Sequence, residues 1–200
     1  MLESISYKIS DLYIENGSIN SEDREIFAYG IRRLILNSFM ILTFTVIGIV
    51  MNEVLNIFIF LIFFIPLRKY AGGFHCESQL NCYIASCLCV ILAIITAREF
   101  SNYNFLLFLS AISTISIITF SPVQNRHKKL TKNEKKVFKR KTLILIAIDA
   151  IICIIFSLLK LFPFLKLIIV GVLIEGLLII LGIIKNSAYK ELRQESQTEN

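Results

Sequence analysis

Charged residues are scarce in this chain of 200 residues, where they make up 18% of the sequence. A soluble globular domain has about 25% charged and about 45–50% apolar residues, whereas this chain is 56% hydrophobic and has a mean hydropathy of +0.70. Its apolar residues fall in long blocks separated by short polar stretches, which excludes a soluble domain, a disordered chain and a fibrous protein. The sequence therefore predicts an all-α polytopic membrane protein.

The sequence offers neither a disulfide framework nor a recognisable cleavable signal peptide. Its five cysteines are an odd number, and most of them lie in or beside apolar blocks, so we expect reduced thiols. Residues 1–33 are polar and carry charges of both signs, so we expect no cleavable signal peptide. The first apolar block should then act as its own insertion signal.

Six apolar runs with few or no charges predict six membrane-spanning helices. They cover residues 34–51, 54–67, 81–97, 104–120, 142–159 and 161–184. A helix needs about 20 residues to cross about 30 Å of hydrocarbon, and the second run is short by this measure. Asn52 and Glu53 between the first two runs predict a tight turn.

The basic residues predict the orientation of the spans. If residues 1–33 are inside, 18 of the 21 basic residues fall in cytoplasmic segments, and Arg98, Lys160 and Lys166 remain outside. Cytoplasmic segments of membrane proteins are rich in Lys and Arg, so both termini are expected in the cytoplasm. We divide the chain into interfacial helices at 1–33, a membrane domain at 34–190 with a basic loop at 121–141, and a disordered polar tail at 191–200.

The N-terminal segment predicts short amphipathic helices. Ile5, Ile9 and Leu12 are spaced to share one helical face, and Gly17 can end that helix. A second helix is expected to begin after Asn20 or Ser21 and to run into the first span. Two interpretations remain open: the helices lie on the cytoplasmic membrane surface, or they pack on the protein's own loops.

The polar stretch between the second and third runs holds the best candidates for chemistry. It contains His75, one of two histidines in the chain, seven residues before Cys82. A thiol needs a base or a cation to become a nucleophilic thiolate near neutral pH. On one straight helix the two residues would stand about 10 Å apart, so His75 must lie in a loop, freed by Gly72 and Gly73, that folds back onto a helix starting near Ser78.

The segment Arg-Lys-Tyr-Ala-Gly-Gly-Phe-His at 68–75, followed by Cys82 and placed between apolar spans, resembles the accessory gene regulator protein B (AgrB) family. The resemblance extends over most of the chain, through the polar N-terminal helices, the six spans and the basic loop. These proteins are bacterial membrane cysteine endopeptidases that process a quorum-sensing propeptide. The resemblance implies that His75 and Cys82 are catalytic, although Cys76, next to the histidine, is a second candidate thiol.

The resemblance also implies a reaction and its partners. Cys82 would form an acyl-enzyme with an AgrD-like propeptide, releasing its C-terminal part, and an internal Cys or Ser of the propeptide would close a thiolactone or lactone. The active site would lie at the cytoplasmic face of the bacterial cell membrane, and lipid and a second copy of the chain are further partners to consider. Neither a cofactor nor a metal is expected.

Residues near this segment and in the basic loop are candidates for supporting roles. Candidate oxyanion donors are Gly72, Gly73, Gln79 and Asn81. Candidate residues for binding an acidic propeptide tail are Arg68, Lys69, Lys128, Lys129 and Lys132. The basic loop is equally well explained as a topology signal that contacts anionic lipid, and the lack of interleaved aromatics argues against nucleic acid.

Asp149 and Glu175 support an alternative function. Ionisable residues within membrane spans are costly and usually face a partner or a cavity. Counting from a turn at 160–162 places the two at similar depth on antiparallel neighbours, where they would share a proton or simply pack within the bundle. The alternative is therefore a small transporter that uses both acids, and it predicts that transport survives loss of Cys82.

Overall fold

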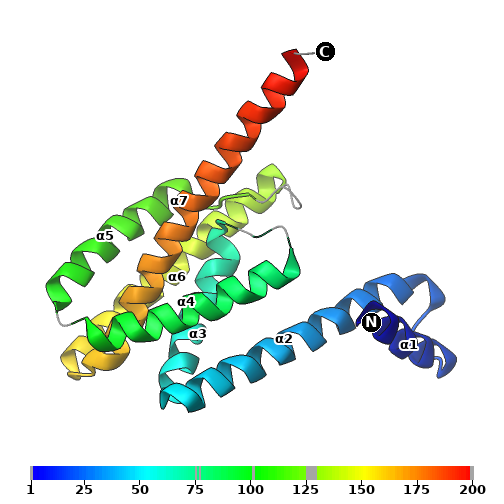
Figure 1. Cartoon of the computed structure of the whole chain (residues 1–200), viewed down its shortest axis with the longest axis horizontal. Coiled ribbons are helices and arrows are strands. Elements are labelled where there is room, and N and C mark those ends of the chain that lie inside the picture. Colours follow the sequence, from blue (N-terminus) through cyan, green and yellow to red (C-terminus); the bar gives the residue numbers. More distant parts are fainter. Residues whose placement is uncertain (1, 75, 77, 101, 125–129, 199–200) are drawn as a thin grey trace. The chain divides into compact units, whose positions relative to one another are not determined.

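The structure is a computed structural model that describes residues 2–74, 76, 78–100, 102–124 and 130–198, the last nine by their backbone only. The α-helices of these residues are α1 (Leu2–Glu15), α2 (Arg24–Met51), α3 (Val54–Ala71), α4 (Gln79–Glu99), α5 (Tyr103–Phe120), α6 (Lys132–Leu158) and α7 (Phe162–Thr198) (Figure 1). A 3-10 turn, η1 (Ser21–Asp23), precedes α2. In the described parts, α2 to α7 are long and apolar enough to cross a membrane, which confirms the prediction of six spans.

The chain divides into two compact units, Met1–Val50 and Met51–Asn200. In the first unit α1 packs against the start of α2. Asp11 accepts hydrogen bonds from Arg24 at 2.6 and 2.8 Å, and the Tyr13 and Phe27 rings lie 5.1 Å apart. The buried face of α1 carries small residues, whereas Leu12 of the predicted apolar face is exposed.

In the second unit α7 is the central helix. It contacts α3, α4, α5 and α6, and Figure 1 shows it, in orange and red, running among these helices. Over half of its most apolar stretch is buried (56%), compared with 28% or less in the other spans of the described chain. Leu67, Ile117 and Ile179 form one core cluster, and Leu106 and Leu165 belong to another. The outer helices direct many large apolar side chains outward, as expected of surfaces that face lipid.

Three helix boundaries differ from the sequence-based expectations. The second span does not end at residue 67. Its helix, α3, contains Pro66 and continues to Ala71, so Arg68 and Lys69 belong to its last turn. The basic segment is not one long loop, because α6 begins at Lys132 behind a capping box formed by Thr131 and Glu134. The predicted disordered tail is wrong as far as residue 198, because α7 continues to Thr198.

Candidate functional site

The chain reverses direction after α3 through two glycines that no other residue could replace without strain. Gly72 and Gly73 have φ angles of +78° and +119°, in the region that favours glycine. The Val123 N–H donates to the Ala71 carbonyl at 3.0 Å, and Gly72 pairs with Val123 in an isolated parallel bridge. A side chain at Gly72 would collide with the Val123 carbonyl. The segment that leads to His75 is therefore held against the residues that follow α5.

Arg68, in the last turn of α3, binds the same segment from the other side. Its Nη1 donates to the Gly72 carbonyl at 2.6 Å and its Nη2 donates to the Phe74 carbonyl. Nη1 also lies 3.5 Å from Oε1 of Glu175 on α7. The Glu175 side chain is completely buried, and within the described chain neither of its oxygens accepts a hydrogen bond.

α7 supplies further contacts to the segment. The Phe74 N–H donates to the Leu178 carbonyl at 2.8 Å. A Cβ atom added at Gly182 would lie 2.7 Å from the Gly73 carbonyl carbon and 2.8 Å from the Phe74 nitrogen. Real Cβ atoms essentially never approach so closely, so Gly182 is what allows the segment to lie directly on α7.

α4 begins where the sequence predicted and carries the candidate nucleophile on its first turn or two. Ser78 is the N-cap, and its side chain accepts a hydrogen bond from the Asn81 N–H at 3.1 Å. The Cys82 N–H donates to the Ser78 carbonyl at 3.1 Å, and the Cys82 side chain is half-buried. The start of a helix also favours nearby negative charge. Cys89, seven residues further along the same face of α4, is also half-buried.

The predicted site residues are only partly brought together by the described chain. His75, Lys128 and Lys129 lie outside the described residues, and Cys76 is a half-buried free thiol. Gln79 and Asn81 are exposed on the first turn of α4. The Gly72 N–H donates to the Arg68 carbonyl at the end of α3, so it is engaged in capping that helix and is not free to act as an oxyanion donor. Arg68 is only 18% exposed, and both of its terminal nitrogens contact groups within the bundle, which disfavours the predicted role in binding an acidic peptide tail.

The start of α6 lies beside the ends of α3 and α5. Lys139 donates to the carbonyls of Ile118 and Ser121. Lys141 lies over the ring of Tyr70, and Phe138 packs edge-on against the same ring. Lys69 and Lys132 are exposed, so basic side chains surround the end of the bundle that carries the segment 72–74.

The two buried acids do not share an environment. Glu175 pairs with Arg68. Asp149, which is 5% exposed, lines a cavity of about 360 Å³ between α5, α6 and α7, together with Ser110, Thr114 and Cys153, and Glu175 does not line that cavity. The sequence does not indicate the Arg68–Glu175 pair, because the second apolar run ends before Arg68 and predicts a loop there, and counting residues from the turn at 160–162 pairs Glu175 with Asp149 instead.

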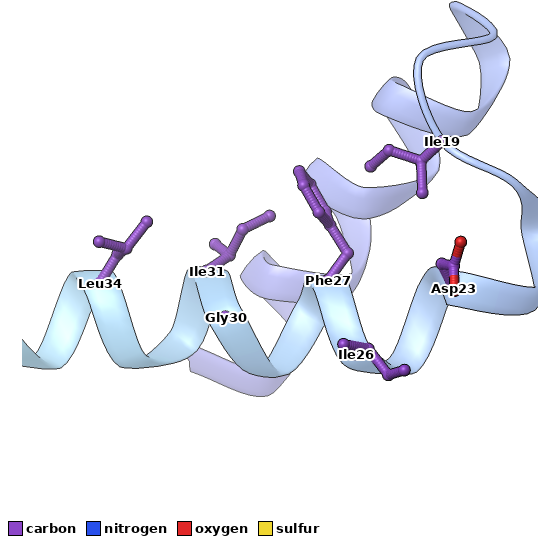
Figure 2. A pocket seen from close by; sticks show the side chains of 7 residues that line it. All are labelled: Ile19, Asp23, Ile26, Phe27, Gly30, Ile31 and Leu34. Atoms are coloured by element: carbon purple, nitrogen blue, oxygen red, sulfur yellow. The ribbon is translucent and has the colours of Figure 1, made fainter.

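An apolar groove in the first unit offers no candidate chemistry. It is lined by Ile19, Asp23, Ile26, Phe27, Gly30, Ile31 and Leu34, and Figure 2 shows Phe27, Ile31 and Leu34 rising from one side of α2. Asp23 is its single polar side chain, and the groove is lined by no His, Cys, Ser or Lys that could work with that carboxylate. Among the residues that the structure describes, no group of three or more His, Cys, Asp and Glu side chains is arranged to hold a metal ion.

Comparisons with known proteins agree on one family. The family model described as Accessory gene regulator B matches residues 6–180. AgrB-like protein 2 of Clostridium perfringens (strain 13) is 29% identical over 157 residues, which cover 74% of this chain and 73% of that protein. Accessory gene regulator protein B of Staphylococcus aureus (strain MW2) is 30% identical over 129 residues, covering 62% and 67%, and that of Staphylococcus intermedius is 23% identical over 149 residues, covering 74% and 77%.

No solved structure matches the chain. The family match nevertheless covers most of the sequence, including the segment from Arg68 to Cys82 and all six candidate spans up to residue 180. The chain is therefore a multi-pass membrane protein that belongs to the accessory gene regulator B family of quorum-sensing systems.

Proposed function

We propose that this protein is a membrane cysteine endopeptidase in which Cys82 is the nucleophile and His75 is the base. The observation that carries the proposal is that both flanks of the His75 loop are anchored. Phe74 is bound through its N–H and its carbonyl, and Ser78 caps the helix that carries Cys82. The chain between these anchors is short, which suits a base that must stay within hydrogen-bond reach of its nucleophile.

The proposed substrate is an AgrD-like propeptide. His75 takes the Sγ proton of Cys82 while the sulfur attacks the scissile carbonyl carbon. The peptide C–N bond then breaks, the proton passes from His75 to the leaving nitrogen, and a thioester remains on Cys82. An internal Cys or Ser of the propeptide next gives its proton to His75 and attacks the thioester carbon. The bond to Cys82 breaks, and His75 returns the proton to the Cys82 sulfur as the thiolactone or lactone ring closes.

Ring closure has to outcompete hydrolysis of the thioester, so a site that excludes water is required. The location of the anchors at the end of an apolar bundle supports this requirement. The basic side chains around the same end support a cytoplasmic site with both termini inside, and exposed Lys69 and Lys132 remain candidates for binding an acidic propeptide tail. We propose the same role for Lys128 and Lys129.

The transporter alternative has weaker support. It requires Asp149 and Glu175 to cooperate, whereas Glu175 pairs with Arg68 and Asp149 lines a cavity that Glu175 does not reach. We therefore retain the endopeptidase as the proposed function.

The test is to trap the acyl-enzyme. Purified protein in liposomes is mixed with an AgrD-like propeptide whose ring-forming Cys has been changed to Ala, and the intact mass is measured. We expect an adduct that maps to Cys82 and disappears in Cys82→Ala and in His75→Ala. The matched control is Cys87→Ala, which removes another half-buried thiol of α4 and should still give the adduct. An adduct on another thiol would contradict the assignment, and no adduct together with no cleavage would contradict the function.

A further inference from the structure

We infer that Glu175 is a positioning residue that holds the segment 72–74, and thereby His75, in place through Arg68. The inference rests on the proposed function, since it concerns the geometry of the same site. It assigns a role to a buried carboxylate on α7, a helix that contributes neither the nucleophile nor the base.

The first argument comes from the contacts of the Arg68 guanidinium. One side chain binds three partners: the carbonyls of Gly72 and Phe74, and the carboxylate of Glu175. The planar fork of an arginine suits such multiple contacts, which a lysine point charge cannot reproduce. Arg68 therefore connects α7 to the two carbonyls that precede His75.

The second argument comes from the burial of Glu175. A completely buried carboxylate within a membrane-spanning helix is expensive unless it is paired. In the described chain the only ion pair of Glu175 is the one with Arg68, and its oxygens accept no hydrogen bond there. Two apolar residues could fill the same space at lower cost, so the pair calls for a role beyond packing.

The third argument comes from the face of α7 on which Glu175 lies. Residues 175, 178 and 182 follow the spacing that places side chains on one helical face. On this face Glu175 binds Arg68, the Leu178 carbonyl accepts from the Phe74 N–H, and Gly182 leaves room for Gly73 and Phe74. α7 thus offers the segment one continuous strip of contacts.

The consequence concerns the residue next to Phe74. Both backbone polar groups of Phe74 are bound, the N–H to α7 and the carbonyl to Arg68. Loss of the Glu175 charge would free Arg68 to turn toward water, and the Phe74 carbonyl would lose its donor. A displacement of about 1 Å near a reacting group can lower a rate about a hundredfold, so the effect should appear in the chemical step rather than in binding of the propeptide.

The test uses three changes in full-length protein reconstituted in liposomes. Glu175→Gln removes the charge with little change in shape. Gly182→Ala leaves the ion pair intact but places a Cβ where the segment lies, and its matched control on the same helix is Gly171→Ala, whose Cβ would meet Phe60 at an ordinary 3.6 Å. The double exchange Arg68→Glu with Glu175→Arg restores a pair of opposite charges but supplies no donor to the carbonyls of Gly72 and Phe74.

Two readouts are needed. The first is kcat and KM for cleavage of an AgrD-like propeptide. The second is the pH profile of Cys82 alkylation by iodoacetamide in a background that lacks the other four cysteines, compared with the profile of His75→Ala. If Glu175 mattered only for folding, its substitution would leave the pH profile of Cys82 alkylation unchanged in protein that inserts into the membrane and elutes as a single species.

We expect Glu175→Gln and Gly182→Ala each to lower kcat by about tenfold to a hundredfold, to leave KM within about twofold, and to shift the alkylation profile toward that of His75→Ala. Gly171→Ala should match the wild type, and the double exchange should not recover kcat. Wild-type kinetics in inserted Glu175→Gln, or recovery in the double exchange, would overturn the inference while the proposed function stands. If wild-type protein neither cleaves nor differs from His75→Ala in alkylation, the proposed function fails and the inference fails with it.

Discussion

The ammonium group of Lys141 lies 4.7 Å from the centre of the Tyr70 ring and donates to the Tyr70 hydroxyl oxygen at 3.4 Å. This contact joins the basic start of α6 to the last turn of α3, two residues before Gly72. Cation–π contacts of this kind contribute about 0.5–1 kcal/mol at exposed sites. The basic start of α6 and the segment that precedes His75 therefore lie at the same end of the second unit.

Neutralising the exposed lysines at the start of α6 should weaken propeptide binding. Lys132, Lys135 and Lys136 are exposed, and exposed ion pairs contribute about 0.2–1 kcal/mol each. The triple change to Gln should therefore raise the KM for an acidic propeptide by at least about threefold and leave kcat unchanged. Because screening acts within about 8–10 Å at moderate salt, the wild-type KM should rise with salt and the variant KM should rise less. Lys8→Gln on α1 is the matched control, and an unchanged KM in the triple variant would leave these lysines as topology signals only.

The topology can be tested with single cysteines in a cysteine-free background. Asn102, the N-cap of α5, is expected outside, and Asn133, in the first turn of α6, is expected inside. A membrane-impermeant maleimide added to intact cells should label Asn102→Cys and should label Asn133→Cys only after permeabilisation. The reverse pattern would refute the orientation inferred from the basic residues.

Cys76 and Cys82 should differ in their importance. Cys82 lies near the capped start of α4, whereas Cys76 belongs to the loop and directly follows His75, where adjacent side chains usually diverge. Cys76→Ser should keep at least about half of the cleavage activity, and Cys82→Ser should lower it by about a thousandfold or more. Both proteins should insert normally when assayed by detergent extraction and gel filtration. Loss of activity in Cys76→Ser with retention in Cys82→Ser would exchange the two assignments.

The contact between α1 and α2 should depend on pH through Asp11. The hydrogen bonds from Arg24 lower the pKa of Asp11 below its ordinary value of 3.8. A carboxyl group whose pKa is lower in the folded state stabilises that state above its unfolded pKa, and the contribution is lost as pH falls through the folded pKa. A nitroxide at Ser4→Cys should thus report an immobile α1 from pH 7 to about pH 4 and greater mobility below it. In Asp11→Asn the spectrum should show greater mobility at every pH, and a spectrum like that of the wild type would remove Asp11 as the pH-dependent contact.

Much of the architecture was predictable because local signals are strong. The apolar runs predict the six spans, and the expected helix start near Ser78 agrees with α4, which Ser78 caps. The helical start of α6 was also readable, since Thr131 and Glu134 have the spacing of a capping box, but the density of positive charge favoured a loop. The Arg68–Glu175 pair was not predictable, because it joins two helices far apart in the chain and depends on α3 continuing past the end of its apolar run.

The two buried acids should respond differently to neutralisation, and this difference separates the proposed endopeptidase from a transporter. Asp149 lines a cavity among α5, α6 and α7, and it is not one of the described partners that Arg68 binds, which are Gly72, Phe74 and Glu175. Asp149→Asn should therefore leave propeptide cleavage within about twofold of the wild type, whereas Glu175→Gln should lower it, as argued above. Both proteins are assayed in liposomes at equal density, with insertion checked by protease protection.

The transporter alternative predicts instead that both changes abolish movement of the transported solute, whereas Cys82→Ala does not. If Asp149→Asn abolished cleavage in correctly inserted protein, the cavity would have to be part of the catalytic machinery, and the separation of the two acids drawn from their contacts would be wrong.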